Sequence, residues 1–357
     1  MKKSFLSFAV IAMMAVTTSF AQSSLVATLV HNDTITAFYG PDALLAAHSA
    51  AVNGDTINLS EGTFYSSDIS KGLTLRGAGM TPDTVAHTGI TTIAGDFTIA
   101  NNGNRVTFEG IYSNHTIRYS GNVSNASFVK CRLNTIGPYS SDGYDYSSGY
   151  TQFNNRLAAT FVNCRIAGVL SLYSKNIDQS SVECINSIVN AAQYHDGVNN
   201  RSRNFLFRNC IVKYNNGSAP GGATSSYYNC IFIDNPGTAA FDASVTAYNC
   251  VDVSDSTLVD KGVFKNISNA SNKAVTGYTE IFKTYKGGDI LNTEDFELTE
   301  TAKTTYLGGD DKQVGIYGGN MAFKPTLDFP QITKFEVADK TTSDGKLNIT
   351  IEVKNAN

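Results

Sequence analysis

The six cysteines of this 357-residue chain all lie in copies or near variants of one short motif. The clearest copies read "TFVNCRI", "LFRNCIV", "SYYNCIF" and "TAYNCVD", and successive cysteines are 33, 20, 26, 20 and 20 residues apart. A unit of about twenty residues cannot bury its apolar side chains alone, so a chain that repeats it is expected to stack the units in a solenoid. The cysteines are Cys131, Cys164, Cys184, Cys210, Cys230 and Cys250.

The residue before the cysteine is Asn in four copies, which predicts a sharp bend at this position. Gly and Asn enter the left-handed backbone region at the lowest cost, so they are favoured where two short strands meet at a corner. Lys130 and Glu183 hold the same place before their cysteines and depart from this rule. The expected bend residues are Gly77, Gly110, Asn163, Asn209, Asn229 and Asn249.

Stacked coils place equivalent residues above one another at the spacing of parallel strands, about 4.8 Å. The residues two positions before the bend are expected to point into the core and to form one column of stacked side chains. The cysteines, one position after the bend, should form a second inward column. Asn side chains at the bend can bond to their neighbours above and below as an asparagine ladder. The first column comprises Leu75, Phe108, Phe128, Phe161, Phe207 and Tyr227, and Ala78 and Ile111 continue the second one.

The cysteines can be free thiols or disulfides. Six cysteines in an exported protein ordinarily suggest three disulfides. Here, however, stacked neighbours share one side-chain direction among apolar residues, which favours buried free thiols. Disulfides between adjacent coils remain the alternative. Because no His lies near the repeated position, no metal site is expected.

Composition favours strands over helices and argues against a nucleic-acid partner. Charged residues make up 16% of the chain, hydrophobic residues make up 42%, and Gly, Asn, Ser, Thr and Tyr are abundant. Short strands with frequent turns and a sizeable core suit this mixture. The formal net charge is -4 and no run of Lys or Arg occurs, so binding to nucleic acid is not expected.

Residues 1–21 predict a secretory signal peptide. Lys2 and Lys3 precede an apolar run, and small or polar residues lead to Ala21, after which cleavage is expected. No cysteine follows to carry a lipid anchor, and no later apolar stretch has the length of a transmembrane segment. The mature chain is expected to be soluble and exported in the Gram-negative manner, to the periplasm, the cell surface or the medium.

The start of the mature chain resembles the right-handed parallel β-helix proteins of the pectate-lyase-like superfamily. The stretch "GPDALLAAHSAAVNGDTINLSEGTFYSSDISKGLTLRGAG" has that family's order of a short helix, a Gly-Asp-Thr-Ile strand, a Gly-Thr-Phe turn and a "KGLTLRG" strand. The resemblance runs from about Thr36 to Gly319 and implies an all-β fold, a right-handed parallel β-helix. Pro41 and Asp42 suit the start of a helix whose apolar face, with Leu44, caps the first coil.

Four segments follow from these patterns. They are the signal peptide (1–21), the β-helix domain with its N-terminal cap (22–319), a linker (320–330) and a C-terminal β-hairpin with its tail (331–357). The stretch "QITKFEVADKTTSDGKLNITIEV" is typical of two strands joined by an Asp-Gly turn. A lone hairpin is marginally stable, so it is expected to dock on the solenoid or to offer an edge to a surface-assembly partner.

The resemblance implies enzymes that act on acidic polysaccharides, but their site motifs are missing. No row of Asp on successive coils resembles the calcium cluster of pectate lyases, so calcium is expected only if the chain is a lyase, and no other cofactor is expected. The polygalacturonase set lacks its Asn-Thr-Asp and Gly-His-Gly motifs, and the only Asp-Asp pair is Asp310-Asp311, outside the regular repeats. The two pectin methylesterase motifs are also absent.

Two long insertions supply the candidate ligand-binding residues, because loops on rigid scaffolds commonly carry function. Tyrosines can stack on sugar rings, and Arg201 and Arg203 can bind a carboxylate or sulfate. The weak catalytic candidates are His195, Arg201 and Arg203, with His195 or a tyrosine as the base of a β-elimination. The alternative without a binding function is that both insertions are solvated loops. The candidate ligand-binding residues are Tyr139, Tyr144, Tyr146, Tyr150, Tyr194 and Asp196.

Three functional hypotheses remain open at this point. The first is an exported, non-catalytic β-helix that presents loops to a polysaccharide or a cell-surface glycan. The second is a polysaccharide lyase or glycoside hydrolase that acts on an acidic polysaccharide. The third is a structural surface scaffold attached through its C-terminal hairpin. The absent motifs and the lack of Trp favour the first.

Overall fold

The computed structural model describes most of the chain after the predicted signal peptide. The described residues are 25–82, 89–100, 104–138, 156–173, 180–195, 204–213, 225–234, 240–254, 262–290, 294–327, 331–337, 340, 345–346 and 349–354.

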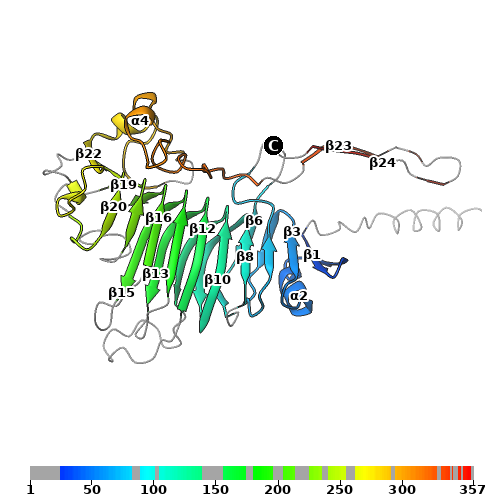
Figure 1. Cartoon of the computed structure of the whole chain (residues 1–357). Coiled ribbons are helices and arrows are strands. Elements are labelled where there is room, and N and C mark those ends of the chain that lie inside the picture. Colours follow the sequence, from blue (N-terminus) through cyan, green and yellow to red (C-terminus); the bar gives the residue numbers. More distant parts are fainter. Residues whose placement is uncertain are drawn as a thin grey trace, which may run out of the picture.

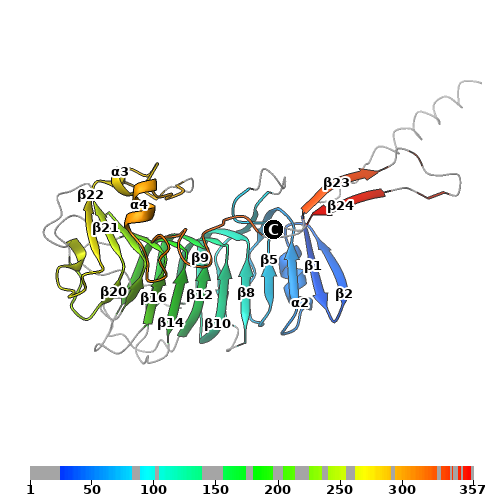
Figure 2. The same ribbon diagram turned by 45° about the horizontal axis from the view of Figure 1, so that its top comes forward.

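Two long sheets run along the molecule and enclose its core (Figures 1 and 2). We call them sheet A and sheet B. In spatial order, the described strands of sheet A are β2 (Thr34–Tyr39), β1 (Val26–His31), β3 (Thr56–Leu59), β5 (Thr74–Arg76), β8 (Val106–Glu109), β10 (Asn122–Val129), β12 (Arg156–Val162), β14 (Ser181–Ile185), β16 (Asn204–Arg208), β18 (Ser226–Tyr228) and β20 (Thr246–Tyr248).

Sheet B runs alongside with strands that alternate with those of sheet A in the sequence. Its described strands, in spatial order, are β4 (Gly62–Tyr65), β6 (Thr91–Ala94), β9 (Ile111–Tyr119), β11 (Arg132–Pro138), β13 (Arg165–Tyr173), β15 (Ile188–His195), β17 (Ile211–Lys213), β19 (Ile231–Ile233), β21 (Val251–Ser254) and β22 (Lys273–Thr276), with β7 (Phe97–Ile99) beside β9. From β3 onward, neighbouring strands in both sheets pair in parallel. The prediction of an all-β parallel solenoid is therefore confirmed.

The described helices are few and lie near the two ends of the solenoid. Helix α2 (Ala43–Ala50) buries Ala43, Leu44 and Ala47 against the first strands. The others are the short η1 (Gly262–Phe264), α3 (Tyr278–Ile281) and α4 (Glu300–Thr305) near the opposite end. No helix among the described residues has the length and apolar character needed to cross a membrane.

Left-handed bends occur at most of the predicted positions. Gly110 and the four predicted asparagines have positive φ, between 51° and 64°. Lys130 also adopts this conformation, with φ of 50°, although its side chain does not favour it. Gly77 lies in the equivalent place but is not left-handed; glycine is required there because a Cβ would lie 2.5 Å from the Gly110 carbonyl oxygen.

The repeat at Cys184, between the second and third cysteine intervals, differs from the prediction. The left-handed residue is Asn186, with φ of 45°, whereas Glu183 lies within strand β14. Cys184 therefore pairs with Phe161 and stands in the aromatic column rather than in the cysteine column. Ser187 takes the vacated place, where its Oγ accepts a hydrogen bond from the Cys164 backbone N–H at 3.0 Å.

The two inward columns form the centre of the core. Phe108, Phe128 and Phe161 stack almost parallel, with ring centroids 4.9 and 4.7 Å apart. All six cysteines are fully buried and free. Burial raises the pKa of the Cys164 and Cys184 thiols, which keeps both protonated. Ala78 does not enter the second column; Thr91 pairs with Ile111 and fills that position.

A segment after the last coil runs back along the bends, and we call residues 307–327 the strap (Figure 2). The coils end at β22, so the predicted boundary at Gly319 falls inside the strap. The Gly309 N–H donates to Asn229 Oδ1 at 3.2 Å, and further along Lys130 Nζ donates to the Thr326 carbonyl at 2.9 Å. Glycine permits this close approach: a Cβ on Gly319 would lie 2.1 Å from Asn209 Nδ2.

The strap changes the role of the bend asparagines. Asn186 Nδ2 donates to the carbonyls of Ile316 and Gly318, each at 2.8 Å. Within the described residues, the Oδ1 atoms of Asn163, Asn186 and Asn209 accept no hydrogen bond. The predicted ladder is therefore not formed at these three asparagines; instead, Asn186 donates hydrogen bonds to the strap and Asn229 accepts one from it.

Described residues from two ranges, 278–290 and 294–323, also build a second apolar core on the outside of sheet B. Ile188, Ile211 and Ile231 point outward from successive coils and are fully buried. The covering side chains include Phe282, Phe296, Val314, Ile316 and Phe323. Beyond the strap, β23 (Gln331–Val337) and β24 (Ile349–Lys354) pair antiparallel as a two-stranded sheet.

A substitution at Asn249 tests the left-handed bend. Asn249→Val places a β-branched residue at a φ of 52°, which is expected to lower the free energy of unfolding by about 1–3 kcal/mol. Asn249→Gly keeps the conformation accessible and is the matched control. Chemical denaturation measures both; equal stability of the two variants would contradict a left-handed bend at this position.

Candidate functional site

The predicted loop site lies mostly outside the described residues. Tyr139, Tyr144, Tyr146, Tyr150, Asp196, Arg201 and Arg203 are not described. The backbones of Tyr194 and His195 form the end of β15, where His195 pairs with Tyr173 of β13. The predicted ligand-binding and catalytic roles of these residues therefore stay predictions.

The outer face of sheet A carries the candidate site that the described residues do build. Strand alternation points every second side chain of these short strands away from the core, so parallel register aligns outward residues in rows. One row consists of hydroxyl residues interrupted by Glu183 and Leu206: Thr56, Thr74, Thr107, Ser127, Thr160, Glu183, Leu206, Ser226 and Thr246.

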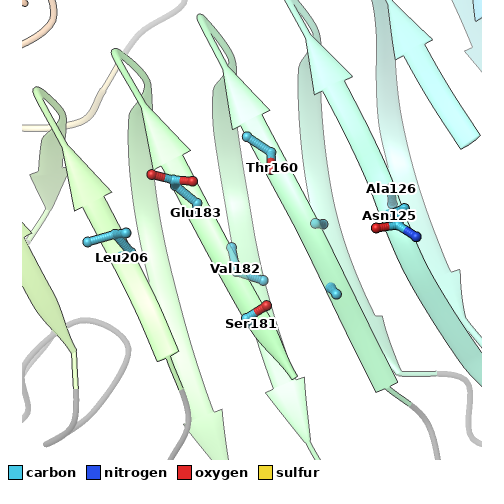
Figure 3. A pocket seen from close by; sticks show the side chains of 9 residues that line it. Asn125, Ala126, Thr160, Ser181, Val182, Glu183 and Leu206 are labelled. Carbon is cyan, nitrogen blue, oxygen red and sulfur yellow. The ribbon is translucent and has the colours of Figure 1, made fainter. Parts of the chain in front are cut away.

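An open hollow of about 350 Å³ lies on this face across β10, β12, β14 and β16 (Figure 3). A bulge in β10 follows Val123, and the left-handed Asn125, with φ of 56°, stands at one side of the hollow. Ala158, whose side chain is small, also lines the hollow. Thr160, Ser181 and Glu183 supply hydroxyl and carboxylate groups to the same space.

A charged and aromatic row begins at Glu183, which lines the hollow. Arg208 Nε donates to Glu183 Oε1 at 3.0 Å, and the Arg208 guanidinium lies 5.0 Å from the centre of the Tyr228 ring. Tyr228 stacks on Tyr248 with centroids 5.7 Å apart and ring planes at 8°. The Tyr248 side chain is exposed. This row thus offers a guanidinium, a carboxylate and two phenol groups on a rigid sheet.

A separate cluster of two arginines lies on sheet B, away from the hollow. Arg132 pairs with Arg165, and the Arg132 guanidinium lies 4.3 Å from the centre of the Tyr112 ring. Burial, with the neighbouring charge of Arg132, lowers the pKa of Arg165 to about 10. Arg165 Nη2 donates to the Glu294 carbonyl at 2.6 Å, so its guanidinium holds residues that follow the last coil.

The acidic residues of the outer face of sheet A are far apart. Among the described residues of its strands, Glu109 and Glu183 are the outward-pointing acids, and they lie on β8 and β14. Three strand spacings separate these strands, which is about 14 Å. Paired glycosidase carboxylates lie about 5–9.5 Å apart, so this pair does not match that geometry. Each carboxylate also binds an arginine, Arg76 for Glu109 and Arg208 for Glu183.

The sequence contained one signal for this face. Tyr228 and Tyr248 are the residues directly before two of the bend asparagines, at the same place in consecutive repeats. Equal spacing predicts that they align in the stack, but it does not show that Arg208 continues their row. The hollow depends on the β10 bulge and on the displaced repeat at Glu183, which the motif spacing does not reveal.

Within the described part of the chain, no group of three or more His, Cys, Asp or Glu side chains is arranged to hold a metal ion. Comparison of the chain with protein-family models, with curated proteins and with solved structures found no match.

Proposed function

We propose that this chain is an exported, non-catalytic β-solenoid that binds a glycan along the outer face of sheet A. The observation that carries the proposal is the continuous row of Arg208, Tyr228 and Tyr248 beside the hollow at Thr160. Sugars are bound by aromatic groups together with hydroxyl and charged groups that donate and accept hydrogen bonds. A rigid sheet holds these groups in place at little entropic cost on binding.

The size and charge of the face favour a neutral oligosaccharide. From β10 to β20 the face spans five strand spacings, about 24 Å, which exceeds the size of one sugar ring. Glu183 and Arg208 neutralise each other, as do Glu109 and Arg76. A polyanion therefore meets no surplus of positive charge on the described part of this face.

Features of the two ends complete the proposal. Helix α2 would act as the cap of the first coil; Ala43, Leu44 and Ala47 belong to the main core, which supports that role. Lys71 Nζ donates to the carbonyls of His48 and Ser49 at the end of this helix, where a cation is favourable. We also propose that the solenoid is right-handed and resembles the pectate-lyase-like proteins, and that residues 1–21 are a signal peptide. The C-terminal hairpin would dock on the solenoid or bind a partner.

Titration of the purified mature protein with neutral and uronic-acid oligosaccharides tests this function. We expect binding of a neutral glycan, without release of reducing or unsaturated ends. Tyr248→Ala should weaken this binding about tenfold, because losing one hydrogen bond or ring contact costs about 1–1.5 kcal/mol. The matched control is Tyr65→Ala, since Tyr65 is similarly exposed but lies on sheet B.

Two results would contradict the proposal. Equal effects of the Tyr248 and Tyr65 substitutions would remove the outer face of sheet A from the binding site. Turnover of any polysaccharide that disappears in His195→Ala or Arg201→Ala would establish the rival hypothesis of a lyase or hydrolase.

A further inference from the structure

Strand β2 forms the N-terminal edge of sheet A and has a neighbour on one side only among the described strands. It pairs antiparallel with β1 over all six residues, and five of those six are exposed. Its sequence, "TITAFY", contains no charge, proline or glycine. Proteins usually protect an open edge with such residues, because an unprotected edge is a template for pairing with another strand.

The two faces of β2 differ. Phe38 pairs with buried Ala27 of β1 and packs against the main core, so alternation points Ile35, Ala37 and Tyr39 to the outer face. Ile35 is 68% exposed and Tyr39 is 56% exposed. An extended strand with two large apolar side chains in water is thus available at the end of the sheet.

Other exposed apolar side chains gather at the same end of the chain's fold. Of the eight large hydrophobic side chains that are exposed in the described part of the chain, five lie between β2 and β4. These are Ile35, Tyr39, Leu45, Val52 and Tyr65. Figure 2 shows β1, β2 and α2 together at this end, away from the strands that form the hollow. Ile35 and Tyr39, which share the outer face of β2, are the members of this set on the open edge itself.

We propose that β2 pairs antiparallel with β2 of a second copy of this chain, with the two-fold axis at Ala37. In this register Ala37 lies opposite Ala37 of the second copy, and Ile35 lies opposite Tyr39 on the same outer face. Pairs of aromatic and β-branched residues stabilise antiparallel strands, and the small Ala37 side chain leaves space at the axis. Sheet A would continue from one copy into the other.

The strand itself favours a second copy over a different partner. It carries no charge that would select a complementary strand, whereas its own sequence places Ile35 and Tyr39 at equal distances on either side of Ala37. The interface is isologous, so it closes after two copies and gives a dimer rather than a filament. It lies at the end of the sheet and does not depend on glycan binding.

Charge substitutions at Ala37 test this register. Sedimentation equilibrium of the mature protein is expected to give the mass of a dimer, and both Ala37→Lys and Ala37→Glu are expected to give the mass of a monomer. Like charges would lie directly opposite each other at the axis in either variant. An equimolar mixture of the two variants should recover the dimer, because opposite charges then meet.

Thr74→Lys is the matched control, since it adds the same charge to the outer face three strands further in and should leave the dimer intact. Tyr39→Arg provides a second variant that should also weaken the dimer. An unchanged circular dichroism spectrum and a cooperative unfolding transition of the monomeric variants exclude misfolding, although their melting temperature should fall as the dimer is lost. A monomeric wild-type protein at high micromolar concentration would overturn the proposal. So would a dimer that survives both charge substitutions, or a mixture that stays monomeric.

Discussion

Phe161→Ala is expected to lower the free energy of unfolding by about 3–5 kcal/mol, as truncation of a fully buried aromatic residue does. The Phe161 side chain is completely buried, and its ring stacks on Phe128 at 4.7 Å with the planes at 5°. On the next coil it meets Cys184, whose side chain is too small to fill the cavity. Urea denaturation followed by circular dichroism measures the loss.

The neighbouring outward residue gives the control for this experiment. Thr160→Ala changes the same strand on its solvent side and is expected to alter stability by no more than about 0.5 kcal/mol. A loss below about 1 kcal/mol for Phe161→Ala would show that the aromatic column is not the packed centre of the solenoid.

Asn186→Leu is expected to destabilise the protein by on the order of 3 kcal/mol. It removes both hydrogen bonds from Nδ2 to the buried carbonyls of Ile316 and Gly318, and each unpaired group costs about 1–3 kcal/mol. Leucine is also strained at a φ of 45°, which adds about 1–3 kcal/mol unless the bend relaxes. Urea denaturation measures the total.

Asn186→Gly separates the two contributions. Glycine accepts the left-handed conformation but lacks the side-chain amide of Asn186, so this variant should lose only the stability that comes from the two hydrogen bonds to the strap. Limited proteolysis should then cleave residues 307–327 faster in both variants than in the wild-type protein. Unchanged cleavage together with full stability would mean that the strap does not depend on Asn186.

The repeat predicted the stacking of coils because its signal is local and recurs many times. Each Asn-Cys pair records a bend and an inward side chain, and stacking follows from the common period. The motif misplaces the bend where the Asn and the Cys are no longer adjacent. At Cys184 the cysteine lies in the aromatic column and Asn186 makes the bend, so a cysteine alone does not identify the register.

The strap and the face of sheet A were not predictable for a different reason. Contacts such as Asn186 with Ile316 join residues 130 positions apart, and no periodic pattern marks them. The glycines at 308, 309, 315, 318 and 319 record the close approach, but they are equally consistent with an ordinary loop. The row of Arg208 and the tyrosines depends on side-chain geometry that appears only when the coils are in register.

The register of the coils can be measured directly by engineered disulfides. The structure pairs Thr160 with Glu183 on adjacent strands, so Cys substitutions at both positions should form a disulfide on oxidation, because paired parallel strands hold their Cα atoms about 4.8 Å apart. A bend at Glu183 would instead pair Thr160 with Ser180. We predict that Thr160→Cys forms a disulfide with Glu183→Cys and does not form one with Ser180→Cys. The opposite pattern would contradict the register of the coils and the binding face that depends on it.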